Sequence, residues 1–302
     1  MGKPLFFDDA EVRAALEPGA LIDEMERALV AFSRGQAQQP VRGLIEVGGG
    51  AGRFASMPAE FGGLVGAKLI TLFPGNAGRL PTHHALVGVF ETREGRALAF
   101  MEAEALTELR TAAVSAVAAR KLARADARVL GVFGSGVQAR SHIAFVRRVR
   151  KIDRVLIWSR NVDHAAALAA EIGGEVGTAE AVARAADIVV TATASDEPVL
   201  RGKWLRPGTL VLAVGAVGRS RRELDDACMR HPVVVDSFAA AEAEGGDLLL
   251  AGVRAVAELG EVLAGAPVPD GACLVFKSHG LAVEDIAAAG LVLRRHGTNV
   301  AP

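Results

Sequence analysis

The sequence predicts an α/β protein in which a doubly wound parallel sheet is joined to an N-terminal α+β domain. Beyond Asp126, short runs of Val, Ile and Leu alternate with helical segments, which is typical of parallel strands covered by helices on both faces. Between Val41 and Met101, Gly, Pro and Asn clusters separate the runs instead, which indicates a largely antiparallel sheet. The chain therefore divides into two regions with different kinds of sheet.

The N-terminal region opens with helix signals and continues with strand signals. Asp8 can cap a short helix that reaches Leu16, and Pro18 sits where the first turn of a second helix begins. A long Ala-rich helix closes the region. We expect strands at residues 64–73, 85–91 and 97–100, and the long helix at 103–124.

The second region repeats strand, turn and helix. We expect strands at residues 129–133, 155–158, 188–192, 210–214 and 233–235, and helices at 138–149 and 162–172. A last helix, about 283–295, lies beyond this alternation and could return to the first domain. The expected boundaries are therefore 1–118 with 283–302 for one domain and 119–282 for the other.

Composition excludes several classes of protein. The formal net charge of -1 argues against nucleic acid as a partner, because phosphate binding normally needs a basic excess. The two cysteines lie far apart in apolar contexts, so we expect neither a disulfide framework nor a metal site. The apolar runs are too short to span a bilayer, and the first residues lack the pattern of a signal peptide. We therefore expect a cytoplasmic protein with no membrane partner.

A glycine-rich turn, Gly134-Ser135-Gly136-Val137-Gln138-Ala139, directly follows the strand expected at 129–133 and opens a helix. In a Rossmann-type domain the first glycine permits the tight turn, the second lets the backbone approach a pyrophosphate, and the alanine keeps the helix close to the strand. The helix N-terminus then offers N–H groups and a positive dipole end to the phosphates. A plain turn without a ligand is the alternative, but the context favours a nicotinamide dinucleotide.

The end of the second strand of this region favours NADPH, with NADH as a weaker cofactor. It reads Ser159-Arg160-Asn161, without the carboxylate that usually bonds the ribose 2′-hydroxyl of NAD. Arg160 can pair with a 2′-phosphate, and Ser159 and Asn161 can donate hydrogen bonds to it. The alternative is that Arg160 is a solvated charge at a strand end.

Eight short stretches, spread over most of the chain, match one known family in order. They are Met57-Pro58-Ala59, Gly66-Ala67-Lys68-Leu69, Leu80-Pro81-Thr82-His83, Leu109-Arg110-Thr111-Ala112-Ala113, Gly136-Val137-Gln138-Ala139, Arg222-Glu223-Leu224-Asp225-Asp226, Gly246-Asp247-Leu248-Leu249 and Phe276-Lys277-Ser278-His279-Gly280. Through them the chain resembles the ornithine cyclodeaminase/μ-crystallin family along essentially its whole length. That family includes cyclodeaminases, an alanine dehydrogenase, ketimine reductases and a hormone-binding lens protein.

The resemblance implies a homodimer whose N-terminal domain supplies the dimer interface and the floor of the substrate site. It also implies that Arg42, Lys68 and Arg110 line a site for the carboxylate of an amino or imino acid, which suits the arginine fork and the lysine point charge. A helix-surface role is the alternative for Arg110, whereas a lysine inside an apolar strand is costly to bury without a partner. The cofactor contacts expected from the resemblance and the neighbouring turns are Thr82, His83, Arg110, Val137, Gln138, Thr193, Val214, Val217, Arg221 and Ser278, the last near the nicotinamide and Arg221 either at a phosphate or solvated.

Two positions depart from the cyclodeaminases. Val217 stands after Gly215-Ala216, where those enzymes carry an aspartate, and Ala55 replaces a second carboxylate two residues before the Met-Pro pair. Neither side chain can exchange a proton or bind an ammonium group, and ornithine oxidation, ring closure and ammonia release need such groups. Ornithine cyclodeamination is therefore disfavoured.

The ketimine reductase branch fits better, through the Trp-x-Arg end of the second strand and the Arg-Glu-Leu-Asp-Asp segment. We expect NADPH-dependent reduction of cyclic ketimine carboxylates, Δ1-pyrroline-2-carboxylate or Δ1-piperideine-2-carboxylate, to cyclic L-amino acids. Hydride transfer to a C=N carbon needs alignment above all. If the enzyme supplies an acid, His279 is the first candidate and Glu244 the second, although His279 can equally well only shape the pocket.

Two other hypotheses about the function stay open. One is a different oxidoreductase of the family, an amino acid dehydrogenase or an ornithine cyclodeaminase. The other is a μ-crystallin-like protein that binds NADPH and a small carboxylate without turnover. The three basic residues do not separate these readings, because binding alone also needs them.

Overall fold

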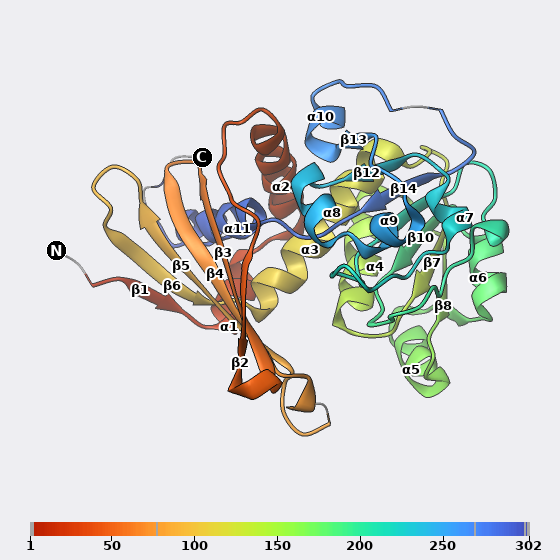
Figure 1. Ribbon diagram of the computed structural model, residues 1–302, viewed down its shortest axis with the longest axis horizontal. Helices are drawn as coiled ribbons and strands as arrows, with labels where there is room; N and C mark the ends of the chain where they lie inside the picture. The colour runs from red at the N-terminus through yellow and green to blue at the C-terminus, as the bar shows by residue number, and fades with distance from the viewer. Residues whose placement is uncertain (1–2, 77, 269, 299, 301–302) are drawn as a thin grey trace. The chain divides into compact units, whose positions relative to one another are not determined.

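The computed structural model describes residues 3–76, 78–268, 270–298 and 300, and the chain forms two compact units. The N-terminal unit consists of Met1–Arg110 with Gly280–Pro302, and the Rossmann unit consists of Thr111–His279. Figure 1 shows the strands and helices of both. Each unit combines a sheet with helices, which confirms the predicted α/β class.

The sheet of the N-terminal unit has the strand order β1-β6-β5-β4-β3-β2. Its strands are β1 (Leu5–Phe7), β2 (Gly43–Val47), β3 (Gly52–Phe61), β4 (Leu64–Leu72), β5 (His83–Glu91) and β6 (Ala97–Glu102). Of the pairs in the described residues, β1 and β6 are parallel and the others antiparallel, so the predicted sheet type is confirmed. The sequence runs indicate β4, β5 and β6 individually, whereas β1, β2 and β3 widen the sheet beyond them.

One face of this sheet is buried and the other carries exposed apolar side chains. Along β4, Leu64, Gly66 and Lys68 are buried, while Val65 and Leu69 are exposed, which is the alternation of a strand with one covered face. The helices of the unit are α1 (Asp9–Ala15), α2 (Pro18–Ser33), the first turns of α3 (Glu104–Leu122) and α11 (Ala282–Arg295).

Helix α11 packs on β3, β4, β5 and α2, and nearly all of its residues are buried. Gly66 permits this close packing, because a Cβ there would lie 2.2 Å from the carbonyl oxygen of Gly88 and 3.0 Å from Ile286 Cδ1. Asp8 caps α1 through a reciprocal capping box with Glu11, as the sequence predicts for that helix start.

The sheet of the Rossmann unit has the order β13-β12-β14-β11-β10-β7-β8-β9, and each described pair is parallel. Its strands are β7 (Val129–Phe133), β8 (Arg154–Trp158), β9 (Glu175–Val176), β10 (Ile188–Thr191), β11 (Leu210–Ala213), β12 (Val233–Val235), β13 (Ala257–Glu258) and β14 (Leu274–Lys277). Its helices after α3 are α4 (Val137–Val149), α5 (Val162–Ile172), α6 (Ala179–Ala185), α7 (Asp226–Met229), α8 (Phe238–Glu244), α9 (Gly246–Ala251) and α10 (Leu259–Leu263). The predicted parallel sheet is confirmed.

The order of the strands creates a switch point beside β7. The chain moves from β7 to β8 on one side and later returns to β10 on the other side, so the connections diverge at the carboxyl end of β7. Ligands of doubly wound sheets bind in this crevice. The central strands are fully buried, with Val132, Val190 and Leu212 all at 0% exposure, because helices cover both faces. Within the described residues, the structure contains no helix that is long and apolar enough to cross a membrane.

Candidate functional site

The glycine-rich turn lies at the switch point, between β7 and α4. Gly134 has φ +124°, and a Cβ there would lie 2.5 Å from the carbonyl oxygen of Ala192, so only glycine fits without strain. Gly136 is the N-cap of α4 and has no side chain to cap it, and a Cβ added there would meet no atom within 4 Å. The turn thus leaves space beside Gly136 at the start of a 13-residue helix, whose N-terminus suits an anion.

A buried histidine supports the first turn of α4. His142 Nδ1 lies 2.7 Å from the carbonyl oxygen of Gln138, and its Nε2 lies 2.9 Å from Ser115 Oγ. Burial lowers the pKa of His142 to about 4, so the ring is neutral at physiological pH. Because a carbonyl can only accept, Nδ1 carries the proton and Nε2 accepts from the serine. The ring thus fixes Gln138, one of the predicted cofactor contacts.

The end of β8 presents the residues predicted to select NADPH. Ser135 Oγ donates to Ser159 Oγ at 3.0 Å, which joins the glycine-rich turn to the neighbouring strand end. Arg160 is exposed. Asn161 is the N-cap of α5, with its Oδ1 accepting from the backbone N–H of His164 at 3.1 Å, so its amide NH2 is the group that can donate outward.

Hydrogen bonds to Glu223 link the carboxyl ends of β10 and β11, a role that the sequence does not predict. Its buried carboxylate accepts from the Thr193 hydroxyl at 2.6 Å, the Thr193 N–H at 2.7 Å, the Thr191 hydroxyl at 2.9 Å and the Gly215 N–H at 2.8 Å. The predicted cofactor contacts Thr193 and Val214 are therefore held on strand ends that one carboxylate ties together. A buried carboxylate needs this many donors to offset its lost hydration.

A second buried group, the ion pair of Asp247 with Lys277, lies at the same carboxyl edge of the sheet. Asp247 Oδ1 accepts from the backbone N–H groups of Glu223 at 2.8 Å and Leu224 at 2.9 Å, and its Oδ2 lies 3.2 Å from Lys277 Nζ. Lys277, at the end of β14, also donates to the carbonyl oxygen of Ala216 at 2.6 Å. The turn that carries Val217 is thus fixed to the ends of two strands.

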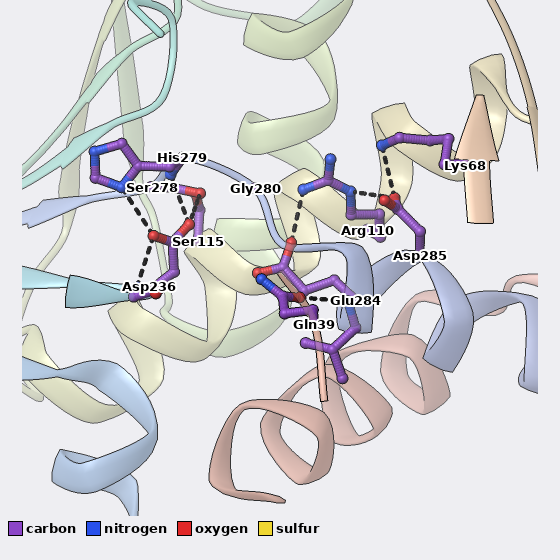
Figure 2. A network of polar contacts seen from close by, with 12 residues as sticks. Gln39, Lys68, Arg110, Ser115, Asp236, Ser278, His279, Gly280, Glu284 and Asp285 are labelled. Atoms are coloured by element: carbon purple, nitrogen blue, oxygen red, sulfur yellow. Dashed lines mark hydrogen bonds and ion pairs between the residues drawn. The ribbon is translucent and has the colours of Figure 1, made fainter. Parts of the chain in front are cut away.

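Asp236, directly after β12, holds two predicted site residues (Figure 2). Its Oδ2 accepts from the His279 N–H at 2.6 Å and from Ser278 Oγ at 3.1 Å, and its Oδ1 lies 2.9 Å from His279 Nδ1. Both Asp236 and the His279 side chain are buried. A Cβ added at Gly245, next to the predicted Glu244, would lie 2.9 Å from His279 Nε2. The structure thus brings His279 to the backbone beside Glu244.

Other predicted cofactor residues have different surroundings. Arg221 Nε pairs with Asp196 Oδ1 at 2.6 Å, and its Nη2 donates to the carbonyl oxygen of Ala194 at 2.9 Å, so its guanidinium engages the loop after β10. Thr82 and His83 belong to the N-terminal unit, where Thr82 Oγ1 lies 2.8 Å from His83 Nδ1.

Lys68 and Arg110, two of the three basic residues predicted to bind substrate, lie in the N-terminal unit beside an acidic pair from α11 (Figure 2). Lys68 Nζ lies 2.8 Å from Asp285 Oδ1, and Arg110 Nε lies 3.0 Å from the same oxygen. Arg110 Nη1 also pairs with Glu284 Oε2 at 2.7 Å. The surface-helix alternative for Arg110 is wrong, because its side chain is only 6% exposed and ion-paired.

Arg42 and Gly280 complete this cluster. Arg42 Nη2 donates to the carbonyl oxygen of Gly280 at 2.9 Å. Gly280 has φ +77°, and a Cβ there would lie 2.7 Å from Arg110 Nη1, so the guanidinium packs directly on its backbone. Gln39 Oε1 accepts from the Val283 N–H at 2.8 Å, which caps the start of α11.

The ionisation of Lys68 reflects these surroundings. Burial, together with the guanidinium groups of Arg110 and Arg42, lowers the pKa of Lys68 to about 8, while the Asp285 carboxylate opposes the decrease. At neutral pH the lysine is still a cation. Ala55, where a carboxylate would stand in a cyclodeaminase, is buried in β3 two residues from Met57, which pairs with Lys68 across the sheet.

Several polar residues of these sites were not predicted from the sequence. They are Gln39, Glu223, Asp236, Asp247, Lys277, Glu284 and Asp285. A signal existed for Asp236 and Lys277, since one carboxylate directly follows an apolar strand and the other residue is a lysine inside an apolar run. Among the described residues, no group of three or more His, Cys, Asp or Glu side chains is placed to hold a metal ion.

A doubly wound sheet with a glycine turn at its switch point is the architecture of dinucleotide-binding proteins. The chain belongs to the ornithine cyclodeaminase/mu-crystallin family, whose model matches residues 3–298. The ketimine reductase mu-crystallin of Mus musculus is 40% identical over 301 residues, with 96% of each chain covered. A Delta(1)-pyrroline-2-carboxylate/Delta(1)-piperideine-2-carboxylate reductase of Azospirillum brasilense is 33% identical over 96% of this chain and 97% of its own length.

Solved structures agree with this assignment. The Delta(1)-pyrroline-2-carboxylate reductase of Thermococcus litoralis, in complex with NADH and L-proline, superimposes with a TM-score of 0.91 at 32% identity and covers 99% of both chains. An archaeal alanine dehydrogenase dimer with bound NAD gives a TM-score of 0.92 at 32% identity, covering 99% of this chain and 98% of that one.

Two alanine substitutions distinguish a structural glycine from a ligand-facing one. Gly134→Ala should lower the free energy of unfolding by about 1–3 kcal/mol, because the positive φ and the nearby carbonyl strain any side chain. Gly136→Ala should cost less, about 1 kcal/mol at most, since its Cβ meets open space and only the N-cap preference for glycine is lost. Urea unfolding without cofactor checks both values.

The same pair tests the phosphate contact. If the backbone of Gly136 approaches a pyrophosphate, Gly136→Ala should weaken NADPH binding about tenfold or more in a fluorescence titration. Wild-type affinity in this folded variant would contradict that approach.

Proposed function

We propose that this chain is an NADPH-dependent reductase of cyclic ketimine carboxylates. Δ1-pyrroline-2-carboxylate and Δ1-piperideine-2-carboxylate are the substrates, and cyclic L-amino acids are the products. The observation that carries the proposal is the cluster of the buried Lys68 and Arg110 with the partly buried Arg42. Reductases of these two imines among the curated and solved relatives support the same reading.

The cluster suits a small carboxylate. Lys68 and Arg110 are nearly inaccessible to solvent, so an anion beside them would be bound at low dielectric, where its attraction is strong. Planar arginine groups match the two oxygens of a carboxylate. A ketimine carboxylate anchored in this way keeps its C=N carbon in one place, and alignment of that carbon is the main requirement for reduction.

The Rossmann unit supplies the features that a nicotinamide cofactor needs. Gly134, Ser135, Gly136, Val137 and Gln138 form the phosphate turn, with open space beside Gly136 and an uncapped helix start. When bound, NADPH provides the hydride that reduces the imine carbon. Exposed Arg160, with Ser159 and Asn161, supports preference for the 2′-phosphate.

Reduction also needs a proton on the imine nitrogen. His279 is the proposed donor and Glu244 the alternative, because Asp236 fixes the ring at Nδ1 and turns Nε2 toward the backbone beside Glu244. A carboxylate on Nδ1 sets the tautomer and orientation of an acid–base histidine. An imine that arrives already protonated would need neither group.

A homodimer is the assembly that we propose. The outer face of the N-terminal sheet exposes Phe6, Leu69, Leu86, Phe90 and Phe100, and apolar patches of this kind mark interfaces. The archaeal alanine dehydrogenase is described as a dimer. Sedimentation velocity tests the assembly, and a monomer at micromolar concentration would contradict it.

The activity itself has a direct assay. The purified chain is mixed with NADPH and each cyclic imine near pH 6, and nicotinamide absorbance is followed. We expect oxidation with at least one of the two imines. Tight NADPH binding without oxidation would instead favour a μ-crystallin-like binding protein, and ammonia release from ornithine with NAD would contradict the argument from Val217 and Ala55.

Cofactor preference depends on the end of β8. Arg160→Asp should raise the KM for NADPH about tenfold or more and that for NADH much less, because the aspartate repels a 2′-phosphate and can bond a ribose hydroxyl. Arg154→Asp is the matched control, at the opposite end of the same strand and paired with Glu175. Equal losses with both cofactors would contradict the role of Arg160.

The proton donor can be tested by substitution at two positions. His279→Gln should lower kcat about a hundredfold or more if His279 donates the proton, with NADPH binding unchanged. Asp236→Asn should lower kcat in the same direction, because the ring loses its orienting carboxylate. A folded His279→Gln variant with wild-type kcat would show that the ring only shapes the pocket.

A further inference from the structure

The acidic pair at the start of α11 has no role in the chemistry described so far. Glu284 and Asp285 are both 0% exposed, and a buried carboxylate is costly unless cations or donors satisfy it. They pair with the two buried cations of the substrate cluster, Arg110 and Lys68. The four side chains form one connected network (Figure 2).

We propose that Glu284 and Asp285 are positioning residues that hold Arg110 and Lys68 in the orientation that binds the substrate carboxylate. This inference rests on the proposed function, since it assigns a role within the same site. Neither acid would touch the substrate, and each acts through the cation that it contacts.

The two acids contact Arg110 at different nitrogens, and Asp285 also contacts Lys68. Asp285 Oδ1 accepts from both Lys68 Nζ at 2.8 Å and Arg110 Nε at 3.0 Å, so a single oxygen joins a strand residue to a helix residue. Glu284 Oε2 takes Arg110 Nη1 at 2.7 Å. These bonds engage the Nε and Nη1 nitrogens of the Arg110 guanidinium with the two acids. Contacts at two nitrogens of the planar fork restrict rotation of the Arg110 guanidinium.

The start of α11 is itself fixed, which makes the pair a rigid reference. Gln39 Oε1 caps the N–H of Val283, immediately before Glu284, and Arg42 Nη2 holds the carbonyl oxygen of Gly280. Gly280 in turn supports the Arg110 guanidinium. The acidic residues therefore cannot drift without breaking several buried contacts.

Asp285 also favours the charged form of Lys68. Asp285 from α11 favours the protonated form of Lys68, whereas Arg110 from α3 and Arg42 from the segment before β2 oppose it. The pKa of Lys68 is about 8 with Asp285 in place. Without that carboxylate the two arginines and burial remain, so the pKa falls and the lysine loses its proton at lower pH.

The test compares Asp285→Asn with the wild type at pH 6 and pH 8. The KM for Δ1-piperideine-2-carboxylate should rise at both values, and at pH 8 by about tenfold or more, because neutral Lys68 no longer attracts the carboxylate. The KM for NADPH should change less than about twofold, because Asp285 acts through the groups that bind the imine carboxylate, whereas kcat should fall because a loosely held carboxylate no longer aligns the C=N carbon. An unchanged imine KM would overturn the proposal.

Glu24→Gln is a matched control that removes a comparable ion pair outside the substrate cluster. Glu24 is buried on α2 and pairs with Arg27 and with Arg294 near the end of α11, away from the cluster. Glu24→Gln should lower stability without changing the imine KM or its pH dependence. If its kinetics matched those of Asp285→Asn, a purely structural role would explain both and the proposal would be wrong.

A direct measurement makes the result independent of the substrate. The sequence has six lysines, so the ¹³Cε signals of labelled lysine are few enough to follow by NMR, with Lys68→Arg for assignment. Lys68 should titrate at lower pH in Asp285→Asn than in the wild type, and an identical titration would overturn the proposal. A shifted titration without turnover of any cyclic imine would refute the proposed function alone.

A second variant covers the case in which Asp285→Asn does not fold. Glu284→Gln then takes its place, and we expect it to raise the imine KM. An unchanged imine KM would overturn the proposal.

Discussion

Burying Lys68 and Arg110 beneath α11 is the constraint on which the N-terminal unit depends. Each ion removed from water costs several kcal/mol unless a partner and hydrogen bonds replace the lost hydration. The partners are consecutive residues on one helix, so that helix must start at a fixed height above the sheet. Gly66 and Gly280 permit this position. A side chain at Gly66 would clash with Gly88 and Ile286, and one at Gly280 would clash with Arg110.

The Rossmann unit solves a related problem at the carboxyl edge of its sheet. Parallel strand ends leave backbone N–H groups without ladder partners, and Glu223, Asp236 and Asp247 accept from these groups at three places. The same carboxylates hold Thr193, Lys277 and His279. The loops that would meet a cofactor are therefore rigid, and a preorganised site loses less free energy on binding than a mobile one.

Patterns local in sequence predicted much of this structure. Continuous apolar runs located β7, β10, β11 and β12, and the glycine turn located the start of α4. The edge strand β1 escaped prediction because three residues carry no periodicity and its pairing with β6 spans the length of the unit. Glu284 and Asp285 read as ordinary helix-start acids, which are favourable there in any exposed helix. The contact of Asp285 with Lys68 is a tertiary fact that depends on residues 217 positions apart.

The lowered pKa of Lys68 also makes the free energy of unfolding depend on pH above neutrality. A lysine in the unfolded chain binds its proton up to about pH 10.5, whereas in the folded state Lys68 releases it near pH 8. Between these values the unfolded state carries more protons, so the contribution of this one group to the free energy of unfolding increases as pH rises. The charge that suits a carboxylate thus destabilises the fold at neutral pH. Alkaline conditions that relieve this cost also remove the charge from the site.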